Sequence, residues 1–204
     1  MTKGITVKKL VGLVALLLTA LLLTACGNDS TSNDDAGSGD TSSEAAFNDA
    51  DVTFAQGMIP HHQQAVEMAQ MAEDRAESPE VKQLASEIEA AQAPEIEQLT
   101  SWLEDWDAEV PSDTMDHGDM GHGDSSSDMS GMMTGEDMGM LEDANGMDFD
   151  RMFLTMMIEH HEGAVAMAET EVADGENPDA IAMAEQIIST QEAEIEQMKG
   201  MLDS

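Results

Sequence analysis

Apolar and small residues recur at intervals of three and four along residues 54–72. At about 100° per residue, Phe54, Met58, Ala65 and Met68 fall in one stripe together with a pair of adjacent histidines, and the intervening glutamines and glutamate lie outside it. This spacing predicts an amphipathic helix whose apolar face is buried.

A second apolar stripe begins after a helix-start signal. Ser78 precedes Pro79, and a capping side chain followed by proline at the first helical position marks a helix N-terminus. The residues that then share one helical face are Val81, Leu84, Ile88, Leu99, Leu103 and Trp106. Residues 54–106 therefore predict two consecutive helices.

The pattern is repeated later in the chain. Residues 51–103 align with residues 150–202 without a gap at a constant offset of 99, with twenty identities over 53 positions. An internal duplication explains this, and each copy is one helical hairpin. Pro60 and Pro94 lie inside helical patterns but have no proline at the matching positions, so we expect local kinks and not helix ends.

The predicted fold is all-α: a pseudo-symmetric, ferritin-like four-helix bundle built from two repeated helical hairpins. Repeat one covers residues 47–106, and repeat two covers residues 148–204. Between them, residues 107–147 are rich in Met, His, Asp, Gly and Ser, and predict a disordered linker.

The N-terminus predicts export and anchoring. Residues 1–25 begin with lysines and continue as an apolar run that is shorter than the roughly 20 residues of a membrane span, which is typical of a signal peptide. The run ends in Leu-Thr-Ala-Cys and is similar to a bacterial lipobox, so we expect lipidation at Cys26 and a location on the outer face of the cell membrane; an uncleaved anchor is the alternative. Residues 26–46 predict a flexible tether.

The charge excludes some partners and favours others. The chain has 43 acidic and 7 basic residues, which give a formal net charge of -36. A surface this acidic repels phosphate backbones, so nucleic-acid binding is excluded, and it attracts cations. One cysteine cannot form an internal disulfide, an iron–sulfur cluster or a cysteine-based zinc site.

The motif Met-x-x-His-His occurs at the same position of both repeats, on the stripe that is predicted to be buried. Burial of four imidazoles without partners would cost several kcal/mol. A metal ion, or a set of carboxylates and amides, must therefore receive them. The two copies comprise Met58, His61, His62 and Met157, His160, His161.

The second helix of each repeat carries polar residues that project onto its apolar face. Metal-bound histidines commonly donate their second N–H to a carboxylate or an amide. We interpret these residues as such outer partners; solvation of a helix edge by the two glutamates is the alternative. They are Gln92 and Glu95, with their repeats Gln191 and Glu194.

The motif also indicates which metal it suits. Di-iron bundles use a Glu-x-x-His spacing, but here methionine stands three residues before each histidine pair. Thioether and imidazole together suit Cu(I) and, by the same softness, Ag(I), whereas Zn(II) would use the histidines alone. Without a second cysteine to serve as a ligand, a blue-copper centre is excluded.

The linker offers a second set of soft ligands. It holds eight methionines in a polar setting that has no core for them to fill, and two Met-x-His pairs are followed by Met-x-x-Met. Such a segment can wrap around a soft ion; an acidic disordered spacer is the alternative. The candidate ligands are Met115, His117, Met120, His122, Met129 and Met132.

Residues 47–203 resemble the family catalogued as domain of unknown function 305. The resemblance rests on the doubled Met-Ile-x-His-His-x-x-Ala-Val-x-Met-Ala motif and the Gln-x-x-Glu-Ile-Glu-Gln ending. It implies a ferritin-like bundle in exported bacterial proteins, some of them linked to copper binding and tolerance, and it does not extend to the linker ligands. The positions that it marks are Met58, His61, His62, Met68, Met157, His160, His161 and Met167.

These observations favour a lipid-anchored extracytoplasmic protein that captures or buffers copper and has no catalytic activity. A metal-dependent oxidase acting on Cu(I) or Fe(II) is the second hypothesis. A metal-free structural or interaction bundle with a pH-sensitive histidine core is the third. The sequence supplies no nucleophile–base pair and no phosphate loop, which weakens the case for an enzyme.

Overall fold

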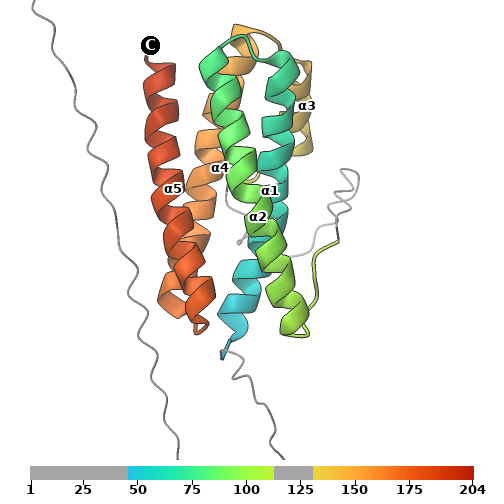
Figure 1. Cartoon of the computed structure of the whole chain (residues 1–204). Coiled ribbons are helices and arrows are strands. Elements are labelled where there is room, and N and C mark those ends of the chain that lie inside the picture. Colours follow the sequence, from blue (N-terminus) through green and yellow to red (C-terminus); the bar gives the residue numbers. More distant parts are fainter. Residues whose placement is uncertain (1–45, 113–130) are drawn as a thin grey trace, which may run out of the picture. The chain divides into compact units, whose positions relative to one another are not determined.

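The computed structural model describes residues 46–112 and 131–204, and within these ranges the chain is almost entirely helical (Figure 1). The predicted signal peptide, Cys26 and the tether up to residue 45 lie outside the described residues. None of the described helices combines the length and the apolar character that a membrane crossing requires. The helices are α1 (Asp49–Arg75), α2 (Pro79–Asp105), α3 (Gly135–Asp143), α4 (Met147–Asp174) and α5 (Pro178–Leu202).

The helix starts are set by the side chains that the sequence indicated. Ser78 accepts hydrogen bonds from the backbone at the start of α2, with Pro79 as the first helical residue. Asn177 and Pro178 do the same for α5. Helices α1 and α2 continue through Pro60 and Pro94, as predicted.

Two hairpins form the bundle. Helix α1 packs against α2, α4 packs against α5, and the hairpins join along α1 and α4. In Figure 1 these four long helices run side by side, and α3 lies beside α1. The predicted all-α bundle of two repeated hairpins is therefore confirmed.

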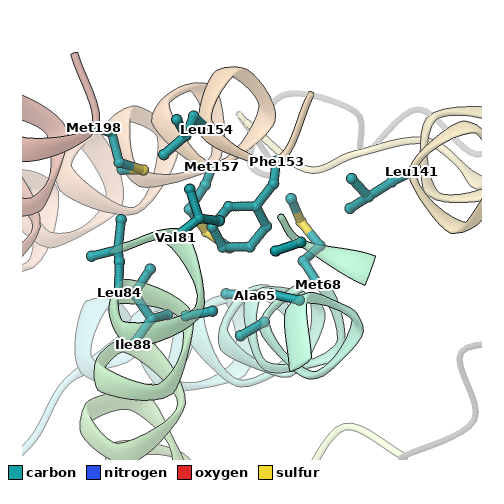
Figure 2. Packing of buried hydrophobic residues seen from close by; sticks show 14 of the residues in the cluster. Ala65, Met68, Val81, Leu84, Ile88, Leu141, Phe153, Leu154, Met157 and Met198 are labelled. Atoms are coloured by element: carbon teal, nitrogen blue, oxygen red, sulfur yellow. The ribbon is translucent and has the colours of Figure 1, made fainter. Parts of the chain in front are cut away.

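The core is divided into two apolar clusters toward opposite ends of the bundle. The Phe153 cluster joins the first half of α4 to the last half of α1, and Figure 2 shows Phe153 and Met157 pointing toward Val81 and Met68. The Phe54 cluster joins the first half of α1 to the last halves of α2 and α4. Its buried members are Phe54, Ala55, Met58, Ile59, Leu99, Leu103, Ala164, Ala168, Ala184 and Ile187.

Helix α3 corrects the prediction that the whole linker from residue 107 to residue 147 is disordered. Thr134 caps α3 and exchanges hydrogen bonds with Asp137, and Leu141 is fully buried in the Phe153 cluster. Met138 is 5 % exposed, so the expectation that linker methionines have no core to fill is wrong for this residue. Tertiary contact stabilises a segment whose local sequence favours a loop.

One aspartate in each repeat accepts hydrogen bonds from the turn between the two helices of the other repeat. We call these two sets of contacts the reciprocal clasps. Asp51 in α1 accepts hydrogen bonds from the backbone N–H groups of Glu176 and Asn177, in the turn between α4 and α5. Its repeat mate, Asp150 in α4, accepts two backbone hydrogen bonds of 3.1 and 2.9 Å from the turn between α1 and α2. The donors in that turn are Glu77 and Ser78.

Candidate metal centre

A layer of four histidines lies between the two apolar clusters. His61 and His62 project from the middle of α1, and His160 and His161 from the middle of α4. All four side chains are fully buried. Because each pair occupies the same position in its repeat, the layer sits on the pseudo-two-fold axis of the bundle.

The first histidine of each pair meets its counterpart at the interface of α1 and α4. The ring centroids of His61 and His160 are 3.8 Å apart, and the ring planes are inclined by 44°. Two protonated imidazoles at this distance would repel each other strongly because little water screens them. The contact is therefore made by neutral rings, or by rings that share an ion.

The second histidine of each pair bonds to a glutamate of its own hairpin. His62 Nε2 lies 2.8 Å from Glu95 Oε2, and His161 Nε2 lies 2.7 Å from Glu194 Oε2. When neutral, each ring donates through Nε2–H to the carboxylate, which leaves the lone pair on Nδ1. The Nδ1 atoms of both rings are buried and make no hydrogen bond within the described part of the chain.

His160 shows the strongest electrostatic perturbation. Burial, followed by the neighbouring imidazoles of His61, His161 and His62, holds its pKa well below the usual value for histidine; a nearby backbone group of His61 acts weakly in the opposite direction. The ring is therefore neutral at physiological pH. In the described part of the chain, neither of its buried nitrogens has a hydrogen-bond partner. Buried imidazole nitrogens that lack such partners fit the requirements of a metal ion.

The two glutamines predicted to support the histidines make no hydrogen bond to them within the described ranges. Gln92 and Gln191 are each 3 % exposed, so both amides lie inside the bundle. The side-chain oxygen and nitrogen of Gln92, and the side-chain oxygen of Gln191, have no hydrogen-bond partner among the described residues. These amides add unsatisfied polar atoms to the interior, close in sequence to Glu95 and Glu194.

The predicted methionines border the histidine layer unequally. Met58 and Met157 are fully buried, one in each apolar cluster, three residues before their histidine pairs. Met68 is also fully buried, in the Phe153 cluster. Met167 is only partly buried, and a Cβ atom at Gly57 would lie 3.5 Å from its sulfur, which places that thioether beside the residue before Met58.

No three His, Cys, Asp or Glu side chains converge on one point in the described ranges. The centre instead offers one facing pair of imidazoles, His61 and His160, and two further imidazoles that are each bonded to a glutamate, with thioethers on both sides of the layer. Of the predicted linker ligands, Met132 is described and partly exposed. The others, Met115, His117, Met120, His122 and Met129, lie outside the described residues.

A surface groove reaches the outer edge of this layer. It lies between α2 and α5, has a volume of about 330 Å³ and is lined by Glu95 together with Trp102 and Met183. Glu95 therefore faces the groove and bonds to the buried His62. An ion that entered the groove would meet a carboxylate first and an imidazole next.

Comparison with known proteins shows which family the chain is similar to. The family model for the domain of unknown function DUF305 matches residues 51–202. No curated protein matches the chain.

Solved structures share this fold. A Streptomyces coelicolor protein described as secreted and as DUF305 is 34% identical, with a TM-score of 0.64, over 76% of this chain and 92% of that one. CopM in its Cu(I)-bound form is 35% identical, with a TM-score of 0.60, over 75% of this chain and 95% of that one. A DUF305 fragment from Deinococcus radiodurans is 29% identical, with a TM-score of 0.66, over 76% and 97%. The chain belongs to the DUF305 family.

Proposed function

We propose that this protein binds copper as cargo and captures or buffers it outside the cytoplasm, with Cu(I) as the preferred form. The observation that carries the proposal is His160, whose two buried ring nitrogens have no hydrogen-bond partner among the described residues while its ring faces that of His61 on the pseudo-two-fold axis. CopM, which has the same fold, has been solved with Cu(I), with Cu(II) and with Ag.

The donor set explains the preference for Cu(I). His61 and His160 would supply imidazole nitrogens, and Met58 and Met157 would supply thioethers. Cu(I) accepts low coordination numbers and soft donors, so it does not need the converging carboxylates that hard ions require. Ag(I) shares this chemistry and makes a suitable probe.

The remaining histidines have a supporting role in this proposal. His62 and His161 are each held by a glutamate, which fixes the ring and directs the Nδ1 lone pair away from the carboxylate. Glu95 also provides an entry route for the ion, because it lines the groove between α2 and α5. An acidic surface raises the local concentration of cations around that entrance.

We also propose that the protein is anchored to the membrane through lipidated Cys26 and faces the extracytoplasmic side. The short apolar N-terminal segment ending in Leu-Thr-Ala-Cys supports this location. The Streptomyces relative, described as secreted, agrees with it. A tethered acidic bundle would intercept copper before it crosses the membrane.

The test is an anaerobic Cu(I) titration against a competing chelator. Replacing His61 and His160 by Leu fills both core positions with apolar side chains and removes two donors. The tightest site should weaken by about two orders of magnitude or more, because loss of a ligand's outer partner alone costs about 10- to 100-fold. Circular dichroism checks that the variant is folded. The matched control replaces His117 and His122, the histidines outside the bundle motif, and should leave the tightest site unchanged.

Unaltered affinity in the folded His61 and His160 variant would contradict the proposed ligands. The oxidase hypothesis is tested in the same samples by admitting air and measuring oxygen consumption with Cu(I) or Fe(II). Turnover that exceeds the metal-only rate and is lost in the histidine variant would favour the enzyme over the binding protein.

A further inference from the structure

A second cavity lies between α3, the residues just before it and the first half of α4, and none of the four histidines lines it. Its volume is about 960 Å³, and we call it the methionine groove. Among the described residues that line it there is no Leu, Ile, Val or Phe, and every large apolar side chain is a methionine. These side chains are Met132, Met133, Met140, Met152 and Met156.

Met133, Met152 and Met156 pack against the Phe153 cluster, but packing does not require methionine at these positions. Met152 and Met156 lie one turn apart on α4, and at the matching positions of α1 the first repeat has Thr53 and Gly57. The repeated hairpin therefore forms without methionine there. Branched aliphatic residues fill a core at least as well as methionine, which is flexible and specifies a packing arrangement poorly.

One wall of the groove is fixed to the bundle by polar contacts. The backbone of Met133 donates to Gln64 Oε1 at 2.7 Å and accepts from Gln64 Nε2 at 2.9 Å. Gly131 packs so closely on α4 that a Cβ atom there would lie 2.6 Å from the carbonyl oxygen of Glu159 and 3.0 Å from the Cα atom of Gly163.

Gln64 and Gly163 occupy matching positions of the two repeats, so this difference between the repeats creates the seat for residues 131–133. The groove is therefore in place before any ligand arrives, which reduces the ordering cost of binding.

The charges around the groove select for cations. Its lining includes several carboxylates and one basic side chain, that of Arg151. Carboxylates attract any cation, but thioethers bind only soft ions with useful strength. The acidic residues are Asp137, Asp143, Asp148 and Glu159.

We propose that the methionine groove is a second binding site for Cu(I), made of thioethers and separate from the histidine centre. The inference rests on the proposed copper-binding function and adds to it a site that requires no histidine. Such a site would hold copper more loosely than the buried centre because its side chains remain partly exposed to water.

The test uses the full mature chain and a variant with four isosteric substitutions that preserve apolar packing: Met133→Leu, Met140→Leu, Met152→Leu and Met156→Leu. The probes are Ag(I), which is stable in air, and Cu(I) under anaerobic conditions. The readouts are the binding stoichiometry and the methyl resonances of the methionines labelled with carbon-13. The matched control carries substitutions outside both grooves, Met71→Leu, Met147→Leu, Met198→Leu and Met201→Leu.

The groove variant should bind about one equivalent less than the wild type, and the control variant should not. In the wild type, the methyl resonances of the groove methionines should shift with Ag(I), and they should still shift when His61 and His160 are replaced by Leu.

Two results would overturn the inference: unchanged stoichiometry in the groove variant, or groove resonances that move only while the histidines are present. Binding that survives in the histidine variant but disappears in the groove variant would support the groove and reject the histidine centre. The two proposals can therefore fail separately.

Discussion

Glu171 is a buried carboxyl group whose partner is another carboxyl group. Its side chain in α4 is 1 % exposed and lies against Asp51, which is fully buried. Burial, the hydrogen bond to Asp51 and the charge of Asp51 together raise the pKa of Glu171 to about 8. When ionised, Glu171 has no hydrogen-bond partner for either carboxyl oxygen among the described residues, whereas a protonated Glu171 can donate a hydrogen bond to Asp51.

Asp51 responds in the opposite direction. Burial alone would raise its pKa, but hydrogen bonds from Glu171 and from the backbone of Asn48, Asn177 and Glu176 outweigh burial and lower it. The first repeat has Ala72 where the second has Glu171. The proton-sharing pair therefore belongs to one clasp only.

This pair predicts a stability that depends on pH. Because the folded pKa of Glu171 is raised, the folded chain keeps a proton that the unfolded chain loses above a pH of about 4.5. The contribution of Glu171 to the free energy of unfolding should then fall as the pH rises from about 4.5 to about 8. Glu171→Gln keeps a donor without a titrating proton, so its urea midpoint should rise relative to that of the wild type over this interval and exceed it at pH 8.

The control for this measurement is Glu169→Gln, at an exposed position of the same helix. It should follow the wild-type curve. If the Glu171→Gln curve runs parallel to the wild type, Glu171 does not hold the proton.

Among the helices, periodicity in the sequence was enough to predict the four long ones. It did not predict α3 or the clasps, whose formation depends on tertiary contacts. The spacing of apolar residues, its repetition 99 residues later and the Ser-Pro signal of the first repeat located the four long helices. The same spacing predicted that the four histidines lie on the buried stripe, and in the structure all four side chains are fully buried. The predicted ligand roles of these residues remain predictions.

Helix α3 could not be predicted because its nine residues include two glycines and four acidic residues, which have weak helix propensity or high polarity. Its order depends on Leu141 and Met138 reaching a core assembled by other helices. The role of the clasp aspartates could not be predicted for a different reason. Asp51 and Asp150 are identical at matching positions, but 43 acidic residues make such a match uninformative on its own.

If α3 is part of the core, Leu141→Ala should destabilise the whole bundle. Leu141 is fully buried, and removing a buried leucine side chain costs about 2–5 kcal/mol through lost transfer energy and a residual cavity. Urea denaturation followed by circular dichroism measures the change. Met140→Ala, at a neighbouring residue that is 46 % exposed, should cost much less, and equal effects would show that α3 only covers the surface.

For the whole molecule, the clasps make each hairpin turn dependent on the other repeat. Asp150→Ala leaves the backbone N–H groups of Glu77 and Ser78 without their acceptor. We expect a loss of about 1–3 kcal/mol in the free energy of unfolding, the cost of leaving partly buried donors unsatisfied. Asp148→Ala is the control, because it removes an exposed carboxylate from the same first turn of α4 and leaves the clasp in place.

If Asp150→Ala and Asp148→Ala lower the free energy of unfolding equally, the effect comes from the lost interaction of a carboxylate with the helix dipole and not from the clasp.

The reciprocity of the clasps has a further consequence. Each half of the chain binds the turn of the other half through residues at matching positions. Such a contact has the geometry of an isologous interface between two identical subunits. Two separate hairpins of one sequence could make the same pair of contacts. Fusion into one polypeptide removed the need for the halves to stay identical. Gln64 opposite Gly163 and Ala72 opposite Glu171 mark where they have since diverged.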